Sequence, residues 1–332
     1  MKLLIIGGTG NISREITQQA AEAGHQVTIF NRGRRLDAKT LKGVRVITGD
    51  RSVPGALEEG VKGLDFDAVI DMISYNVQDA RTTMSVFDGR VGHVIFTSSV
   101  AAYVLPMKEF PATEGNVRLR TEGSFAYGFN KAQMERFLFS APHQSPVTII
   151  RPSLTFGVGC QNIGVLRQNA NIFRRIRDGR PLVMFGDGTS IWSFTFAPDM
   201  GSAYVKALFR QSTFNRAFHV TSGHVNIFED LYTTIGNIAG RRPVIVHATA
   251  DMLMAFNPTL FEHISLEKKY GALFDCSSFR SAVPDWRPQL DLQTGMEQIC
   301  QWWVSQGLPF DPDKDALEDK ICTSVQRFIE SV

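Results

Sequence analysis

Short apolar runs alternate with longer amphipathic stretches over the first 150 residues of the chain. The runs predict buried strands at Lys2–Ile6, Gln26–Phe30, Val44–Thr48, Phe66–Ile73, His93–Thr97 and Val147–Ile150. Between them the pattern predicts helices, among them Asn11–Ala23 before the stop signal Gly24, Val77–Phe87 and Tyr127–Phe139. Strands that alternate with helices form a parallel sheet covered on both faces, so we expect an α/β, doubly wound fold.

The pattern becomes irregular after Arg151-Pro152. Glycine-rich turns appear at Gly157-Val-Gly159 and Gly186-Asp-Gly188, and the C-terminal tract contains Trp286, Trp302 and Trp303. This change predicts a second, smaller α/β domain over the carboxyl ends of the strands. We expect residues 1–155, with roughly 192–215, to form the first domain, and residues 156–191 and 216–332 to form the second.

Composition narrows the classes of partner. The chain has 332 residues with 43% apolar residues, enough for a substantial core, and 35 Lys+Arg against 33 Asp+Glu give a net charge of +2. So small a charge does not favour nucleic acid or an anionic membrane surface, and we expect a small-molecule partner. The start of the chain is too weakly apolar for a signal peptide, and no stretch approaches the ~18 apolar residues of a membrane span, which predicts a cytoplasmic protein.

The cysteine pattern does not predict a disulfide or a metal site. Cys160, Cys276, Cys300 and Cys322 form no C-x-x-C pair, and no histidine lies at ligand spacing from them. We interpret them as buried or incidental thiols and expect no bound metal.

A glycine-rich loop joins the first strand to its helix. Gly7, Gly10 and Ser13 form a G-x-x-G-x-x-S arrangement, in which the glycines permit a tight turn and the close approach of a pyrophosphate to helix N-terminal N–H groups. Ser13 stands where close helix–strand packing needs a small residue. The context of strand, loop and helix predicts dinucleotide binding.

The end of the second strand bears on the choice of dinucleotide. The sequence Phe30-Asn31-Arg32-Gly33-Arg34-Arg35 has no acid to bind ribose hydroxyls, as an NAD site would. Asn31 with Arg32 suits a 2′-phosphate, so NADP(H) is favoured over NAD(H). Arg34 and Arg35 are interpreted as solvated loop charges.

Three residues have the types and spacing of a proton-transfer site. Tyr127 and Lys131 are four residues apart on one helix face, where an ammonium lowers the pKa of a neighbouring phenol. Ser99 follows the strand His93–Thr97, at the sheet edge where α/β proteins bind ligands. Together with the glycine loop, these residues predict an enzyme site.

At this point the chain resembles the extended short-chain dehydrogenase/reductases, also called NAD-dependent epimerase/dehydratases, which have a Rossmann domain and a smaller substrate domain. The resemblance lies in Gly7–Ser13, Gly49-Asp50, Thr97-Ser-Ser99 with Tyr103, Tyr127 and Lys131, Arg151-Pro152, and Gly186-Asp-Gly188. It implies an NAD(P)-dependent oxidoreductase or epimerase acting on a sugar-like or other hydroxy/keto substrate. Proteins that resemble this chain often dimerise through the helices at 77–87 and 127–139, and the oligomeric state of this chain stays open.

The resemblance also implies individual roles. Tyr127 is the acid/base, Lys131 binds the nicotinamide ribose and assists Tyr127, and Ser99 positions the substrate oxygen. The implied cofactor contacts also include the residues Gly7, Thr9, Gly10, Asn11, Ile12, Asn31, Arg32, Asp50 and Arg51. Asp50 and Arg51 are implied to lie near the adenine.

Two departures concern the substrate. Nucleotide-sugar enzymes resembling this chain usually have an asparagine where Leu154 stands, and an arginine in the segment that here contains Trp192. We therefore expect a smaller, neutral or weakly charged substrate. Trp192 is interpreted either as a stacking surface for that substrate or as a core residue. It stays open whether one of three nearby arginines supplies the positive charge that a diphosphate would need, namely Arg167, Arg174 or Arg175.

Other functions within the same fold remain open. A catalytically silent NADP(H) sensor is disfavoured because Ser99, Tyr127 and Lys131 are all present. The chain also resembles chloroplast stem-loop-binding proteins, and Arg174–Arg177, Arg180 and Arg241-Arg242 are candidates for an RNA-binding patch, although solvated charges are the favoured interpretation. Dehydratases resembling this chain place an acid beside the catalytic serine, whereas Val100-Ala-Ala102 follows here, which favours redox chemistry or epimerisation.

Overall fold

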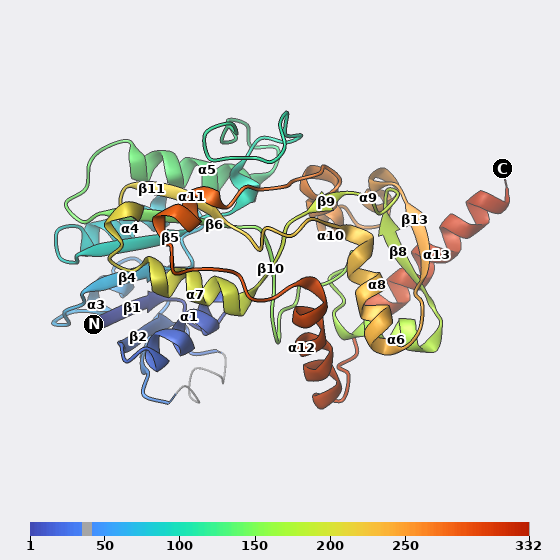
Figure 1. Ribbon diagram of the computed structural model, residues 1–332, viewed down its shortest axis with the longest axis horizontal. Helices are drawn as coiled ribbons and strands as arrows, with labels where there is room; N and C mark the ends of the chain where they lie inside the picture. Colours follow the sequence, from blue (N-terminus) through green and yellow to red (C-terminus); the bar gives the residue numbers. More distant parts are fainter. Residues whose placement is uncertain (35–41, 332) are drawn as a thin grey trace.

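The larger part of the protein is a parallel sheet covered by helices. The computed structural model describes residues 1–34 and 42–331, and its two parts lie end to end along the long axis of the molecule (Figure 1). A seven-stranded sheet has the order β11-β6-β5-β4-β1-β2-β3, and all neighbouring strands are parallel. Its strands are β1 Lys2–Ile6, β2 Gln26–Asn31, β3 Arg45–Thr48, β4 Ala68–Asp71, β5 His93–Thr97, β6 Val147–Pro152 and β11 Arg216–Val220. The doubly wound α/β fold is therefore confirmed.

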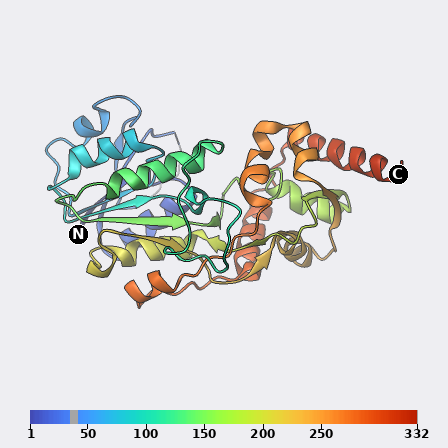
Figure 2. The same ribbon diagram turned by 90° about the horizontal axis from the view of Figure 1, so that it is seen from above.

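Alternation along β1 explains why both faces of the sheet are covered. Leu3 and Ile5 pack into one apolar layer, whereas Leu4 and Ile6 pack into the other. The first layer includes α1 Asn11–Glu22, α7 Ala197–Ala207 and α11 Ser277–Ala282, and the second includes α3 Ala56–Gly60, α4 Val77–Phe87 and α5 Ala126–Phe139. Figure 2 shows the two helix layers on either side of the sheet.

The smaller part mixes short strands with helices around its own core. Its strand pairs are β7 Leu154–Phe156 with β10 Phe194–Phe196, β8 Pro181–Phe185 with β13 Val244–Ala248, and β9 Ile191–Trp192 with β12 Asn226–Ile227. Its helices are α6 Ala170–Asp178, α8 Phe228–Ala239, α9 Ala250–Phe256, α10 Pro258–His263, α12 Leu292–Ser305 and α13 Pro312–Glu330. Short helical turns are η1 Val100–Ala102 and η2 Gln211–Thr213 in the larger part and the π-helical η3 Ile264–Lys268 in the smaller part.

The domain boundaries differ from the expected ones beyond residue 215. Residues 216–220, expected in the second domain, form β11 at the edge of the large sheet, because their backbone pairs with β6 and Phe218 and Val220 pack under the helices. Trp286 also packs in that layer, beside Phe279 of α11. Trp303, by contrast, lies in the core of the smaller part. The chain thus returns to the larger part after its first crossing.

The remaining expectations about the chain concern thiols, metals and membranes. Cys160, Cys276, Cys300 and Cys322 are free and buried, as interpreted from the sequence. Within residues 1–34 and 42–331, no three His, Cys, Asp or Glu side chains gather in a way that would hold a metal ion. No helix in the same described ranges has the length and apolarity needed to cross a membrane.

Candidate active site

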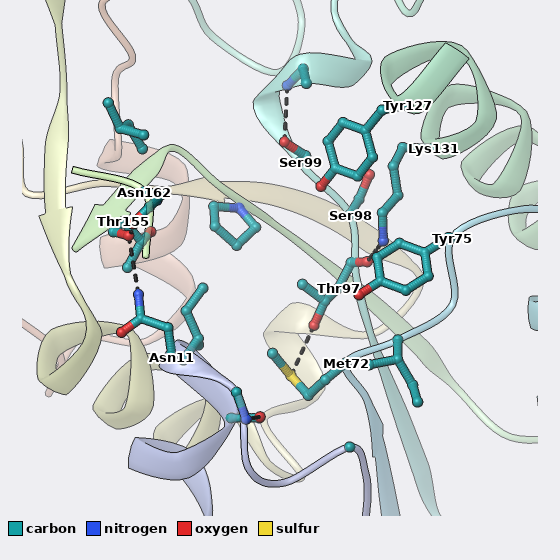
Figure 3. Close-up of a pocket in the computed structure, with 18 of the residues that line it drawn as sticks. Asn11, Met72, Tyr75, Thr97, Ser98, Ser99, Tyr127, Lys131, Thr155 and Asn162 are labelled. Carbon is teal, nitrogen blue, oxygen red and sulfur yellow. Dashed lines mark hydrogen bonds between the residues drawn. The ribbon is translucent and has the colours of Figure 1, made fainter. Parts of the chain in front are cut away.

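One cavity of about 1070 Å³ connects the carboxyl edge of the large sheet with the smaller part. The glycine loop lines one end of this cavity, and residues of η3 line the other. Figure 3 shows Ser99, Tyr127 and Lys131 on one side and Asn11, Thr155 and Asn162 on the opposite side. The cavity therefore brings the predicted cofactor loop and the predicted proton-transfer residues together.

The glycine loop has the backbone geometry that a phosphate cradle needs. Gly7 and Gly8 have φ values of +117° and +85°, and a Cβ on Gly8 would lie 2.5 Å from Cγ2 of Ile29. The N–H of Gly10 donates to the hydroxyl of Ser13 over 2.8 Å, so Ser13 closes the turn as well as filling the packing position. The predicted residues Gly7, Thr9, Gly10, Asn11 and Ile12 all line the cavity. This loop fits a dinucleotide pyrophosphate at the start of α1.

The residues at the end of β2 make different contacts. The Asn31 side chain donates to the carbonyl of Gly7 over 3.1 Å and accepts from the N–H of Gly33 over 2.7 Å, so its amide braces the loop. Arg32 and Arg34 both line the cavity. Arg34 is exposed, as expected for a solvated loop charge, while it also borders the cavity, and Arg35 lies outside the described residues.

Asp50 and Arg51 line the same end but are held differently. The carboxylate of Asp50 accepts from the N–H and hydroxyl of Ser52, which lower its pKa. Arg51 donates to both carboxylate oxygens of buried Asp71, over 3.0 and 2.9 Å. Burial raises the pKa of Asp71, but Arg51 and two hydroxyl donors outweigh it and the net shift is downward. Arg51 is therefore part of a buried network that borders the predicted adenine site.

Close helix packing places Tyr127 beside Ser99. Gly128 follows Tyr127 on α5, and a Cβ on Gly128 would lie 2.2 Å from the carbonyl oxygen of Ala101. Only glycine allows α5 to approach η1 this closely. Ser99 caps η1, accepting from the N–H of Ala101 over 3.1 Å. The sequence analysis missed this role of Gly128, although a glycine directly after the predicted catalytic tyrosine was the available signal.

Tyr127 lies on the cavity wall with its hydroxyl in a desolvated place. Its side chain is 42% exposed into the cavity. Burial of the hydroxyl raises the pKa of Tyr127 to about 12, while a hydrogen bond with Ser99 acts in the opposite direction and Glu267 adds to the increase. In the absence of a ligand the phenol is therefore protonated at neutral pH, ready to donate.

Lys131 is almost completely buried and points to the strand ends. Its ammonium donates to the carbonyl oxygens of Ser74 and Thr97, over 2.6 Å each. Burial lowers the pKa of Lys131 to about 8, while Asp71 and Glu135 act to raise it. The ammonium also lies 5.0 Å from the ring centroid of Tyr75. Lys131 thus remains mostly charged at pH 7 within a wall of backbone carbonyls.

The smaller part contributes residues that the sequence analysis did not identify. From the smaller part, the cavity is lined by Thr155, Asn162, Thr259, Glu262, His263, Glu267 and Lys268. Asn11 and Asn162 both donate to the carbonyl oxygen of Thr155, over 3.1 and 3.3 Å. The segments 154–167 and 259–268 are distant in sequence. The sequence analysis considered Leu154 and Arg167, but no local motif marked the other cavity residues of these segments.

Trp192 does not line the cavity, which corrects its interpretation as a substrate contact. Its side chain is 1% exposed and lies in the core of the smaller part, with its ring edge-on to Phe228. The alternative reading as a core residue is the one that the structure supports. Leu154, in contrast, does line the cavity and supplies an apolar wall.

The three arginines considered as sources of charge differ in position. Arg167 lines the cavity. Arg174 donates to the backbone carbonyl of Leu308. Arg175 is completely buried and forms ion pairs with Asp315 at 2.9 Å and Asp319 at 2.7 Å. Of the three, only Arg167 can reach a ligand in this cavity.

Comparison with known proteins places the chain in a family. The family model described as NAD dependent epimerase/dehydratase matches residues 3–220. A 2′-dehydrokanamycin reductase from Streptomyces kanamyceticus is 25% identical over 95% of this chain and 88% of its own length. The chloroplast stem-loop binding protein of 41 kDa b from Arabidopsis thaliana is 23% identical over 89% of this chain and 77% of its own length.

Solved structures agree on the fold. The UDP-glucuronic acid 4-epimerase from Bacillus cereus, solved with UDP-glucuronic acid and NAD, superposes with a TM-score of 0.75 at 15% identity, covering 92% of this chain and all of that one (100%). The parallel sheet, the glycine loop and the cavity above the strand ends are thus found in a chain matched by the family model over most of its length. The protein belongs to the NAD-dependent epimerase/dehydratase family and is an enzyme of its oxidoreductase/epimerase type.

Proposed function

We propose that the protein is an NADP(H)-dependent oxidoreductase that interconverts a ketone and a secondary alcohol on a sugar-like substrate without a nucleotide diphosphate. The observation that carries the proposal is the placement of Ser99, Tyr127 and Lys131 on the same cavity as the glycine loop. The similarity to a 2′-dehydrokanamycin reductase along almost the whole chain supports reduction in particular.

Each residue of this group has a distinct task. Tyr127, protonated at neutral pH, gives its proton to the carbonyl oxygen during reduction, and Ser99 hydrogen-bonds the same oxygen. Lys131 holds its charge beside the strand ends, where it favours the tyrosinate that proton transfer leaves. When bound, the nicotinamide supplies or accepts the hydride. Gly7, Gly10 and the first turn of α1 would hold the pyrophosphate.

The preference for NADP(H) depends on Arg32. The amide of Asn31 donates one N–H to Gly7 and accepts from Gly33, which leaves one N–H for a ligand, so the charged group available for a phosphate is that of Arg32. Arg32 and Arg34 line the cavity at the end of β2, and no carboxylate follows that strand directly. An arginine at this place favours a 2′-phosphate.

An apolar wall argues against a nucleotide-diphosphate substrate. Leu154 lines the cavity where related nucleotide-sugar enzymes have an amide, and Trp192 is withdrawn into the core. A dianion that leaves water needs several paired hydrogen bonds to offset its desolvation. Among the described residues that the smaller part contributes to the cavity wall, the cations are Arg167 and Lys268, and Lys268 already forms an ion pair with Glu267 at 3.0 Å.

An RNA-binding function has less support in the charge distribution. Arg175 and Arg180 of the proposed basic patch are paired with Asp315 and Asp319. Arg241 donates to the carbonyl of Arg177. Compensated charges of this kind offer little attraction for a phosphate backbone. A salt-dependent RNA shift assay tests this alternative directly.

Two further points of organisation stay proposals. We propose that the dinucleotide domain comprises residues 1–155 with β11 and the segments around α7 and α11, and that the smaller part forms the substrate domain. Homodimerisation through α4 and α5 is proposed from family resemblance, and sedimentation velocity tests it.

The proposed function is tested by screening candidate substrates with reduced and with oxidised cofactor. Purified protein with NADPH or NADH is offered keto-sugars and other cyclic ketones, and the oxidised cofactor with polyols, free sugars and glycosides, while absorbance of the reduced cofactor is followed. Turnover of a ring ketone or its alcohol is expected. Micromolar binding of UDP-, GDP- or dTDP-sugars in calorimetry with saturating cofactor contradicts the proposed substrate class.

A further inference from the structure

A π-helical turn forms part of the cavity wall at the end away from the glycine loop. Residues Ile264–Lys268 form η3, and its last two residues, Glu267 and Lys268, both line the cavity. Turns of this kind are rare and often occur at functional sites. In a regular α-helix, consecutive side chains diverge by about 100°. The distortion therefore coincides with a pair of adjacent polar side chains on the same cavity wall.

Glu267 and Lys268 form a buried ion pair. The Lys268 ammonium lies 3.0 Å from the Glu267 carboxylate, and the two side chains are only 9% and 8% exposed. Burial lowers the pKa of Lys268, and Glu267 opposes that shift. Two buried charges cost more free energy than apolar residues of the same volume would. If these two positions served packing alone, apolar residues would make the protein more stable than the ion pair does. The presence of the pair therefore indicates that it acts on a molecule in the cavity.

Trp192 contacts both the ammonium and the backbone of Lys268. The Lys268 ammonium lies 3.9 Å from the centroid of the Trp192 ring, and the indole N–H donates to the carbonyl oxygen of Lys268 over 3.1 Å. The hydroxyl of Ser190 donates to the same carbonyl over 2.8 Å. Both the backbone and the ammonium of Lys268 are thus fixed before any ligand arrives.

The pair of Glu267 and Lys268 offers both hydrogen-bond acceptors and hydrogen-bond donors. An ammonium has three N–H donors, and in the described part of the chain only Glu267 engages that of Lys268 as an acceptor. The carboxylate of Glu267 has further lone pairs that can accept. A hydroxyl group both donates and accepts, so two adjacent hydroxyls match a neighbouring donor and acceptor.

The charges around the pair are balanced. Arg167 and Glu262 also line this end, with one charge of each sign. The pKa of His263 is lowered to about 3 by burial, with Arg167 and Lys268 adding to the decrease, so its ring is neutral at pH 7. Neither a dianion nor a polycation finds an excess of countercharge here to offset its desolvation.

We propose that Glu267 and Lys268 bind two adjacent hydroxyl groups of an uncharged sugar-like substrate whose reacting carbon faces Tyr127. Trp192 is a positioning residue for Lys268. This inference rests on the proposed function for the reacting end of the substrate, but the hydroxyl-binding pair is testable through binding alone.

The test is calorimetry on the whole protein saturated with oxidised cofactor. Three probes share a pyranose ring and differ in charge, namely methyl α-D-glucopyranoside, UDP-glucose and the polycationic kanamycin. The neutral glycoside is expected to bind more tightly than the other two. Glu267→Gln and Lys268→Met should each weaken it about tenfold, the loss of a charge-assisted hydrogen bond. Lys269→Met, at the exposed neighbouring residue, is the matched control and should leave affinity unchanged.

A second variant protects the test against misfolding. A single substitution leaves one buried charge without its partner, whereas the double variant Glu267→Gln/Lys268→Met removes both charges. The double variant is expected to keep the melting temperature and cofactor affinity while losing glycoside affinity to about the same extent as either single variant.

The outcomes separate this inference from the proposed function. Unchanged glycoside affinity in the double variant, tighter binding of UDP-glucose or kanamycin, or no saturable binding of the glycoside to the unmodified protein each overturns the inference. Binding of the neutral glycoside that depends on the pair, but without turnover of any ketone or alcohol, contradicts the proposed redox function and leaves the hydroxyl-binding pair standing.

Discussion

The two ends of the cavity are built on different principles. The cofactor end uses the loop Gly7–Ser13 and the carboxyl ends of strands of one sheet, and its key residues belong to short motifs or follow a strand closely in the sequence. The smaller part contributes residues of 154–167, among which Thr155 contacts Asn11 beside the loop, and residues of 259–268 at the other end. These two segments are distant in sequence and meet only in the folded chain. The first end is generic and local, and the second is specific and formed by long-range contacts. The proposed specificity for the substrate is thus located where sequence motifs are few.

The largest effect is expected at the cofactor end. Gly10 has φ −80°, which any residue adopts, and a Cβ there would meet only the Ser13 hydroxyl, at 3.3 Å. Gly10→Leu should therefore fold but obstruct the pyrophosphate. Loss of two N–H···phosphate bonds at about 1.5–3 kcal/mol each lowers affinity at least about a hundredfold, measured by fluorescence titration of NADPH.

Gly8→Ala provides the contrasting variant at this end. Gly8 has φ +85°, and its Cβ would lie 2.5 Å from Ile29, so this substitution should lower the melting temperature. Wild-type NADPH affinity in a folded Gly10→Leu protein would remove the basis for assigning the loop to the cofactor.

Arg32→Ala is expected to have the next largest effect. An arginine–phosphate hydrogen bond contributes about 1.5–3 kcal/mol, so affinity for NADPH should fall roughly ten- to a hundredfold while affinity for NADH stays the same. Parallel titrations of the two cofactors measure this. A loss of equal size for both cofactors would show that Arg32 acts on the shape of the loop and not on the 2′-phosphate.

The pH dependence of ketone reduction should follow Lys131. Reduction needs a protonated Tyr127, with a pKa of about 12, and a charged Lys131, whose pKa is about 8 because of burial. Both conditions hold below pH 8, and Lys131 loses its proton first as pH rises. The value of kcat/KM should therefore fall about tenfold per pH unit above 8. Lys131→Met, with much lower activity, should lack this descending limb; a flat wild-type profile up to about pH 10 would contradict the role of its charge.

The smallest effect is expected at Trp192, behind the substrate end. Trp192→Phe keeps an aromatic ring but removes the N–H donor to Lys268 and weakens the cation–π contact. A loss of about 0.5–1 kcal/mol raises KM two- to fivefold, with kcat unchanged. A drop in kcat with an unaltered KM would indicate that Trp192 acts on Tyr127 instead.

Much of the cofactor end was predictable from the sequence because its signals are periodic or local. The strand His93–Thr97 and the helix Val77–Phe87 have the bounds that were predicted. Ser99, Tyr127 and Lys131 line the predicted edge because parallel strands end together. The bracing role of Asn31 was not predictable, since it depends on the distance from its amide to Gly7 in the folded chain.

The substrate end was not predictable because its contacts are neither periodic nor local in the sequence. Glu267 and Lys268 look in sequence like an ordinary charged pair on a helix face, and neither the π-helical turn that contains them nor their position on the cavity wall has a local sequence signal. Trp192 has the aromatic character of a ligand contact, yet its packing against Lys268 is a tertiary contact. Likewise, the return of residues 216–220 to the large sheet depends on pairing with β6.

Comparison of Tyr127→Phe with the unmodified protein tests the central claim, proton transfer by Tyr127 at this cavity, most directly. The substitution removes only the hydroxyl, so NADPH affinity should stay nearly the same, while turnover of the ketone identified in the screen should fall by about a thousandfold. Tyr75→Phe, which alters another phenol bordering the cavity, controls for loss of a hydroxyl at this wall. Retention of most of the turnover by Tyr127→Phe would contradict the account.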